Sequence, residues 1–312
     1  MKAHIFSKLS QAIKNDVLGV QNTLTSVKAN VAVVQDVQQQ QWDAQKLQQH
    51  QALMQWLSAS DFAAQHHDII SRKEEGTGQW FLDSTEFEAW QQGPKKILFC
   101  PGIPGAGKTM IAAIAIDHLF KRAQVEDIGV AYLFCNYKEQ LEQTSTALLA
   151  IVLKQLIQNR PDAAGPVTQI YQRHEKQKSK PSRDEIFGIL QSVCLAYPTV
   201  YLVIDALDEC TTQDGSRTQL VKGLRQLEAK TGIRLMFTSR FIPEVTEEFQ
   251  SEPTLELRAS DQDVRRYLAG QLSHLPRCVQ REPQLAHEVQ HHIAEAVDGM
   301  YVILASWAYK VD

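Results

Sequence analysis

The feature that most constrains this chain is a glycine-rich segment that joins two apolar runs. The segment Gly102-Ile-Pro-Gly-Ala-Gly-Lys-Thr109 fills every fixed position of the pattern GxxxxGK[ST]. The apolar run 95–100 precedes it, and the segment 108–122, with apolar residues at helical spacing, follows it. A strand, a tight glycine turn and a helix are the context in which this pattern holds phosphate groups. We therefore predict a phosphate-binding loop at the N-terminus of a helix.

The residue types in this segment suit a nucleoside triphosphate with Mg²⁺. Glycines let main-chain N–H groups approach phosphate oxygens, because no side chain stands in the way. We expect Lys108 to reach the β- and γ-phosphates as a catalytic group, and the Thr109 hydroxyl to ligate Mg²⁺. The expected nucleotide-binding residues are Gly102, Ile103, Pro104, Gly105, Ala106, Gly107, Lys108, Thr109 and Met110.

The second candidate element of the site is acidic and follows another apolar run. Residues 199–204 are almost entirely apolar and lead to Asp205, and Asp208 and Glu209 come shortly afterwards. Ligands of parallel sheets sit beyond the carboxyl ends of the strands, so Asp205 is predicted to hold the Mg²⁺ shell. By itself Asp205 is also compatible with a helix N-cap. Asp208 and Glu209 are both candidates for the carboxylate that orients and deprotonates the attacking water.

A third polar strand end is the segment 234–240, which finishes in Thr238, Ser239 and Arg240. We predict that Arg240 reads the γ-phosphate and signals its presence, although an arginine in a loop is also often simply exposed. No NKxD-type tetrapeptide that reads guanine follows any expected strand. ATP is therefore the expected nucleotide, and GTP stays possible.

The alternation of apolar runs with helical patterns predicts an α/β fold. Runs without polar alternation are typical of parallel strands that are covered on both faces. Strands are expected at 95–100, 128–135, 199–205 and 233–238, helices at 108–122, 145–158, 184–196 and 219–230, and a charged loop at 175–183. After about residue 258 the pattern is helical, with helices expected at 261–272, 282–297 and 300–310. The fold class is thus a P-loop NTPase with a central, mostly parallel sheet flanked by helices.

The N-terminal segment differs from the rest of the chain. Apolar residues recur there at alternating steps of four and three, the seam of a helix that packs on another helix: Ile13, Val17, Val20, Leu24, Val27, Val31 and Val34. A glutamine-rich stretch, 35–55, follows. The helix suits an intramolecular bundle, which we favour, or self-association. We divide the chain into a helical segment (1–60), a connector (61–93), the NTPase core (94–258) and an incomplete C-terminal helical region (259–312).

Composition excludes several classes of partner. The formal charge of −4 gives no overall basic field to attract nucleic acid or an anionic membrane, so we expect no nucleic acid as a partner, and a local basic patch stays open. No signal peptide begins the sequence, and the late apolar run 300–309 is too short for a bilayer, which needs about 20 residues. The five cysteines form no CxxC pair, so we predict reduced thiols in a cytoplasmic protein.

Taken together, the segments GIPGAGKT, VYLVIDALDEC and LMFTSR resemble the NACHT branch of the signal-transduction (STAND) NTPases, in particular fungal NOD-like receptors and the nephrocystin-like N-terminal domain. The flanking residues agree with this resemblance: they lie at 56–62, 76–82, 86–90, 255–268 and 298–301. The resemblance implies an ATP-dependent switch in innate-immunity or self/non-self-like signalling, with a protein partner that is not identified. In that family the residues before the P-loop approach the base, which makes 76–80 a candidate; for Trp80 a packing role is equally compatible. The family's C-terminal sensor repeats are not present by residue 312, so we expect a truncated receptor or one without a sensor.

Three functions remain open from the sequence. The leading hypothesis is a weak NTPase, converting ATP and water to ADP and phosphate, that works as a conformational switch and self-associates through the N-terminal helix or the NTPase domain. The second is a non-hydrolysing scaffold that the nucleotide stabilises. The third is a P-loop kinase of a small molecule, for which an arginine-rich lid is expected; the pair Arg265-Arg266 instead predicts a solvated helix face.

Overall fold

The computed structural model describes residues 2–271 and residue 284, and the chain forms two units, residues 1–56 and 57–312. The first unit belongs to one long helix, α1 (Lys2–Leu57). The helices expected at 282–297 and 300–310, and Cys278, lie outside the described residues apart from residue 284. Among the residues that the structure describes, no helix has both the length and the apolar character needed to cross a membrane.

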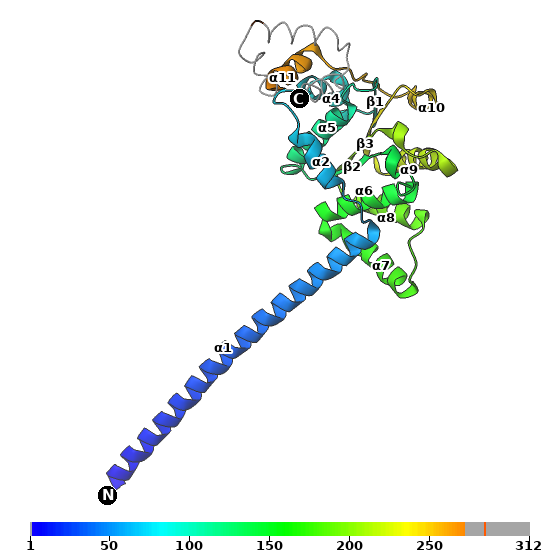
Figure 1. Cartoon of the computed structure of the whole chain (residues 1–312). Coiled ribbons are helices and arrows are strands. Elements are labelled where there is room, and N and C mark those ends of the chain that lie inside the picture. The colour runs from blue at the N-terminus through cyan, green and yellow to red at the C-terminus, as the bar shows by residue number, and fades with distance from the viewer. Residues whose placement is uncertain (1, 272–283, 285–312) are drawn as a thin grey trace. The chain divides into compact units, whose positions relative to one another are not determined.

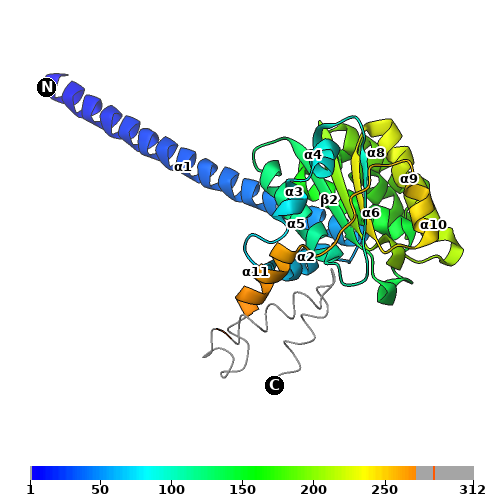
Figure 2. The same cartoon turned by 90° about the horizontal axis from the view of Figure 1, so that it is seen from above.

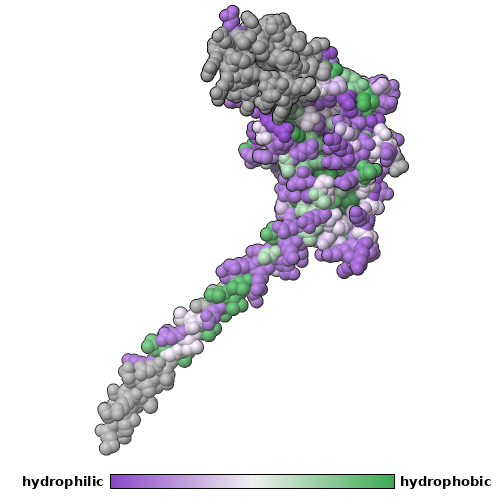
Figure 3. All heavy atoms as spheres, in the orientation of Figure 1, coloured by the Kyte–Doolittle hydropathy of each residue, from purple (hydrophilic) through white to green (hydrophobic). Residues whose placement is uncertain are grey.

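The apolar seam of α1 lies on the surface of this helix. Its described side chains are between 50% and 69% exposed: Val20, Leu24, Val27, Val31 and Val34. Figure 3 shows hydrophobic side chains at intervals along the helix, between stretches of hydrophilic ones. Large apolar side chains on one face of a helix usually pack against another helix. That helix can belong to the same chain or to a second copy, so the bundle and self-association both stay predictions.

The second unit contains a four-stranded parallel sheet, as predicted. Its strands are β1 (Ile97–Pro101), β2 (Ile128–Phe134), β3 (Thr199–Asp205) and β4 (Arg234–Ser239), in the order β1-β4-β3-β2. Nearly every strand residue is buried, which explains why the strands are apolar without alternation. All four strands run parallel, so their carboxyl ends meet at one edge of the sheet.

Helices cover both faces of the sheet (Figures 1 and 2). One face carries the helix that follows the glycine-rich segment together with a helix of the connector: α5 (Lys108–Ala123) and α2 (Phe62–Ser71). The other face carries three helices that pack on one another: α6 (Ser145–Asn159), α8 (Arg183–Leu195) and α9 (Ser216–Thr231). Short helices complete the unit: α3 (Gln79–Leu82), α4 (Thr85–Gln92) and α10 (Pro243–Thr246). The result is the predicted α/β architecture of three layers.

The predicted charged loop at 175–183 is partly wrong. Residues 175–177 form the last turn of α7 (Gly165–Gln177), and α8 already begins at Arg183. Sequence reasoning missed α7 because it buries little: only Val167 and His174 of its residues are buried. A helix that is polar over most of its length is easily mistaken for a charged loop.

A segment beyond β4 returns along the free edge of β1. The amide of Phe99 donates to Pro253 O at 2.9 Å, and the amides of Leu255 and Leu257 donate to Phe99 O and Pro101 O at 2.9 and 2.7 Å. A Cβ atom on Gly102 would lie 2.6 Å from Leu257 O, so only glycine lets the two backbones approach this closely. This pairing carries the chain back beside the glycine-rich segment, where α11 (Asp261–Gln271) begins.

The four described cysteines, Cys100, Cys135, Cys194 and Cys210, are free and buried. Burial raises the pKa of the Cys194 thiol to about 12 and that of Cys100 still further. Thiols held in the protonated form are poor nucleophiles, and the four free thiols agree with the prediction of reduced cysteines.

The sheet core makes a stability prediction possible. Leu202 lies on β3 opposite Ala131 and Leu235 of the neighbouring strands and is fully buried. Leu202→Ala is expected to lower the free energy of unfolding by about 2–5 kcal/mol, because it removes packed methyl groups and leaves a cavity. The matched control Leu195→Ala, at an exposed position of α8, is expected to cost less than about 0.5 kcal/mol. Urea unfolding followed by circular dichroism measures both; equal effects would contradict the assigned core.

Candidate functional site

The glycine-rich segment forms a tight loop between β1 and α5. Gly105 and Gly107 adopt φ values of 81° and 82°, the left-handed region that glycine enters without strain. Ala106 N donates to Ile103 O at 3.2 Å, and Gly102 N donates to Ser239 O at 3.0 Å. The second of these bonds ties the loop to the carboxyl end of β4. The loop therefore lies at the sheet edge where polar strand ends gather.

Lys108 starts α5, and its side chain folds back over the loop. Its Nζ donates to Gly102 O at 2.9 Å and to Ile103 O at 2.8 Å. Partial burial lowers the pKa of Lys108, while the nearby carboxylates of Asp208 and Asp205 oppose that shift. The ammonium group is thus held where the loop, the acidic strand end and α5 converge.

Asp205 ends β3 and is almost fully buried. Its Oδ1 accepts a hydrogen bond from the Thr238 hydroxyl at 2.6 Å. Burial raises the pKa of Asp205, and the hydroxyls of Thr238 and Thr109 and the charge of Lys108 oppose the rise. The structure thus brings the two expected Mg²⁺-binding residues together, and adds Thr238 as a residue that positions one of them.

Asp208 and Glu209, which the sequence could not separate, have different surroundings. The Asp208 side chain is 1% exposed and accepts from Arg240 N at 3.0 Å and from Arg240 Nε at 2.5 Å. This bond raises the pKa of the Arg240 guanidinium. Glu209 is half-buried, and its carboxylate accepts one amide, Tyr137 N, at 3.3 Å. Asp208 therefore holds Arg240, and Glu209 is the carboxylate with more acceptor capacity left for a water molecule.

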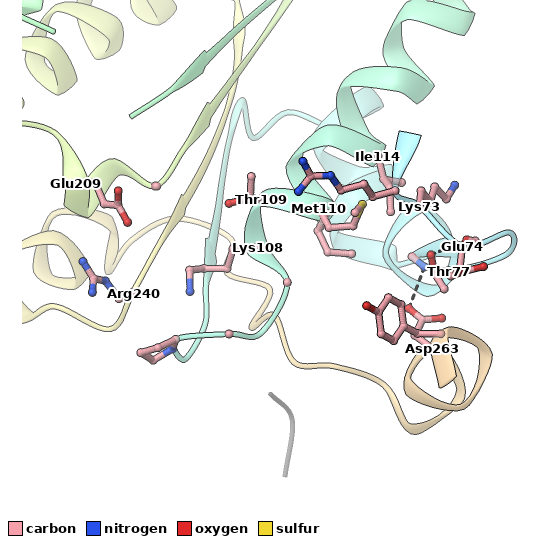
Figure 4. A pocket seen from close by; sticks show the side chains of 18 of the residues that line it. Lys73, Glu74, Thr77, Lys108, Thr109, Met110, Ile114, Glu209, Arg240 and Asp263 are labelled. Carbon is pink, nitrogen blue, oxygen red and sulfur yellow. Dashed lines mark hydrogen bonds between the residues drawn. The ribbon is translucent and has the colours of Figure 1, made fainter. Parts of the chain in front are cut away.

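One cavity of about 490 Å³ is lined by Lys108, Thr109, Asp208, Glu209 and Arg240, but not by Asp205 or Thr238. In Figure 4, Lys108 lies between Glu209 and Arg240 on one side and Thr77 and Asp263 on the other. The first side is polar and charged. The wall on the other side combines the apolar side chains of Met110, Ile111 and Ile114 beside Gly78 with charged side chains from the connector, which are Arg72, Lys73 and Glu74. One end thus suits an anionic tail and the other a flat, weakly polar group.

Several lining residues were missed by sequence reasoning. Asp263 and Tyr267 of α11 reach the cavity from far along the chain, and no local pattern marks them. Arg265 and Arg266 are both exposed, as the predicted solvated face requires, and the Arg266 guanidinium also donates to Gly76 O at 2.6 Å. Trp80, for which a base contact and packing were both open, donates from its indole nitrogen to Asp263 at 3.0 Å.

The donor set fits Mg²⁺. A magnesium ion in a phosphate site takes one or two protein oxygens and completes its octahedron with phosphates and water. The paired Thr109 hydroxyl and buried Asp205 carboxylate are oxygens of this kind. Among the described residues there is no group of three or more His, Cys, Asp or Glu side chains that could hold a metal ion. A magnesium site completed by phosphates and water does not need such a group.

The fold and this cavity together define a nucleotide-binding domain of the P-loop NTPase class. The model of the family "Nephrocystin 3, N-terminal" matches residues 76–240, and the chain belongs to this family. This match confirms the nephrocystin-like resemblance of the sequence motifs. The chain is also 25% identical, over 240 residues, to the vegetative incompatibility protein HET-E-1 of Podospora anserina. That alignment covers 72% of this chain and 17% of the fungal protein, so the chain spans about a sixth of its relative.

Solved structures with a similar chain path include two replication proteins. Domain III of the replication initiation protein DnaA of Thermotoga maritima aligns with a TM-score of 0.39 and 16% identity, covering 74% of this chain and 82% of that one. AMPPCP-bound DnaA of Aquifex aeolicus aligns with a TM-score of 0.39 and 13% identity, covering 74% and 60%.

Proposed function

We propose that this protein binds ATP with Mg²⁺, hydrolyses it slowly, and uses the two nucleotide states as a conformational switch. The observation that carries the proposal is the single cavity in which Lys108, Thr109, Glu209 and Arg240 line one end and apolar side chains of α5 line the other. A triphosphate needs cations, amides and a metal site, whereas an adenine ring needs a mostly apolar slot. This cavity offers both within one volume.

Each residue at the polar end has a proposed part. The loop amides and Lys108 hold the β- and γ-phosphates, and the lysine exchanges its bonds to Gly102 O and Ile103 O for phosphate oxygens. Thr109 and Asp205 hold Mg²⁺, which would neutralise developing charge on the phosphates. Glu209 orients the attacking water and accepts its proton.

Arg240 is the proposed sensor of the γ-phosphate. Its side chain is 46% exposed and paired with Asp208, so it can reorient toward a new anion without leaving a deeply buried site. A γ-phosphate competes with Asp208 for the guanidinium, and hydrolysis ends that competition. The pairing of Arg240 is therefore expected to differ between the ATP and ADP states.

The biological setting is also part of the proposal. HET-E-1 is a vegetative incompatibility protein, and we extend from it a role in self/non-self-like signalling in the cytoplasm. A NACHT-type switch of this kind passes its state to a protein partner through assembly. The exposed apolar seam of α1 supports self-association as the route.

Size-exclusion chromatography with light scattering tests the switch on the full chain. We expect a larger mass with a non-hydrolysable ATP analogue and Mg²⁺ than with ADP, because only the γ-phosphate reaches Arg240. The double variant Leu24→Glu, Val31→Glu places charges in the apolar seam and should abolish the larger species if α1 mediates assembly. The double control Asn22→Glu, Ser26→Glu places two charges on the same helix at exposed positions outside the seam and should leave the larger species intact. One unchanging mass in both nucleotides would favour the non-hydrolysing scaffold.

A further inference from the structure

The loop 76–78 is held in place by a residue 185 positions further along the chain. Asp263 Oδ2 accepts the amide of Gly78 at 2.9 Å and the indole N–H of Trp80 at 3.0 Å. Asp263 lies on α11, which follows the segment paired with β1. One carboxylate oxygen thus connects the post-sheet helix to the connector in front of the glycine-rich loop.

This carboxylate is buried, with its side chain 3% exposed. A buried carboxylate is costly unless donors surround it, and here two donors meet at one oxygen. Arg266 lies 3.7 Å from the other oxygen and also donates to Gly76 O at 2.6 Å. Both ends of the short loop 76–78 are therefore fixed by α11. A loop held at two points from one helix cannot shift unless that helix shifts as well.

The loop also forms part of the apolar end of the cavity. Thr77 and Gly78 line it beside Ile111 and Ile114 of α5. Gly78 has a φ of 75°, and a Cβ atom there would lie 2.4 Å from Ile114 Cδ1. The Gly78 backbone is thus confined between Ile114 on one side and Asp263 on the other. Its position sets the width of this end of the cavity, while Lys108 and Thr109 belong to the other end.

We infer that Asp263 is a positioning residue that fixes the base end of the nucleotide site and couples its occupancy to α11. The inference rests on the proposed nucleotide binding and adds a division of labour to it. The loop amides and Lys108 hold the phosphates, and the Asp263-to-Gly78 and Asp263-to-Trp80 bonds hold the wall against which the base packs. Moving that wall changes the affinity for the nucleoside part alone, and binding of the nucleoside part restrains α11.

Two ligands separate the two ends of the cavity: ATP and inorganic tripolyphosphate, each with Mg²⁺ and measured by calorimetry on the full chain. Asp263→Ala is expected to weaken ATP binding by about tenfold or more and to leave tripolyphosphate binding within about twofold, since only the base end loses its support. The control Glu256→Ala, at an exposed ion pair just before α11, should change neither affinity. A thermal melt of each variant checks folding, and unfolding would weaken both ligands equally.

Trp80→Phe gives a second, milder variant. It removes one donor to Asp263 and keeps an aromatic ring, so it should weaken ATP binding in the same direction and by less. In the Asp263→Ala background, Trp80→Phe should have no further effect, because the acceptor is already gone. Unchanged ATP affinity in Asp263→Ala, or equal losses for ATP and tripolyphosphate, would overturn the inference alone. A wild-type chain that binds neither ligand would overturn the proposed function and this inference with it.

Discussion

Lys108→Ala is expected to lower the affinity for ATP with Mg²⁺ by about 10²- to 10⁴-fold, below detection in an ordinary titration. The estimate takes two charge-assisted contacts to phosphate oxygens at about 1.5–3 kcal/mol each. No other described lysine or arginine starts α5 or bonds to the glycine-rich loop with its side chain, so the loop loses its one bonded ammonium group among the described residues. Calorimetric titration of the full chain gives the affinity directly.

The control for this variant lies on the same helix. Lys121 forms an exposed ion pair with Asp117 near the end of α5, far from the cavity lining. Lys121→Ala removes the same charge from the same helix and should leave ATP affinity unchanged. If Lys108→Ala binds ATP as tightly as Lys121→Ala does, the assignment of the phosphate end fails.

Glu209→Gln is expected to lower the rate of ATP hydrolysis by about 10²- to 10⁴-fold while ATP binding persists, which is the usual size of a general-base contribution. The amide keeps the shape of the side chain and its bond to Tyr137 N but cannot take a proton from water. Phosphate release measured with ATP and Mg²⁺, without any added acceptor, also separates a hydrolase from a kinase of a small molecule.

Two further variants serve as the control and the alternative for the Glu209→Gln prediction. Glu142→Gln, at an exposed position shortly after Tyr137, should hydrolyse ATP at the wild-type rate. Asp208→Asn should disturb Arg240, because it weakens the acceptor of two hydrogen bonds. If Asp208→Asn abolished hydrolysis and Glu209→Gln did not, the water-activating role would belong to Asp208.

The phosphate end of the site could be read from the sequence because its parts are local. The loop 102–109 is one contiguous pattern, and Asp205 and Arg240 each follow an apolar strand. Parallel strands bring their carboxyl ends to one edge, so three separate motifs predict one location. The choice between Asp208 and Glu209 could not be made, because it depends on which carboxylate meets Arg240 across two strand ends.

The base end could not be predicted in the same way. Asp263 contacts Gly78 only because residues 253–257 pair with the edge of β1 and return the chain to the loop. No periodicity or spacing in the sequence predicts the pairing of residues 253–257 with β1. Helix α7 was missed for a related reason: its stability comes from a few tertiary contacts rather than from a broad apolar face.

The most direct test is a structure of the full chain with a non-hydrolysable ATP analogue and Mg²⁺. We expect the γ-phosphate within hydrogen-bond distance of Lys108 Nζ, the metal ion on the Thr109 hydroxyl, and the base against Thr77 and Gly78. Phosphates bound outside the 102–109 loop, or a nucleotide held elsewhere on the protein, would contradict the account.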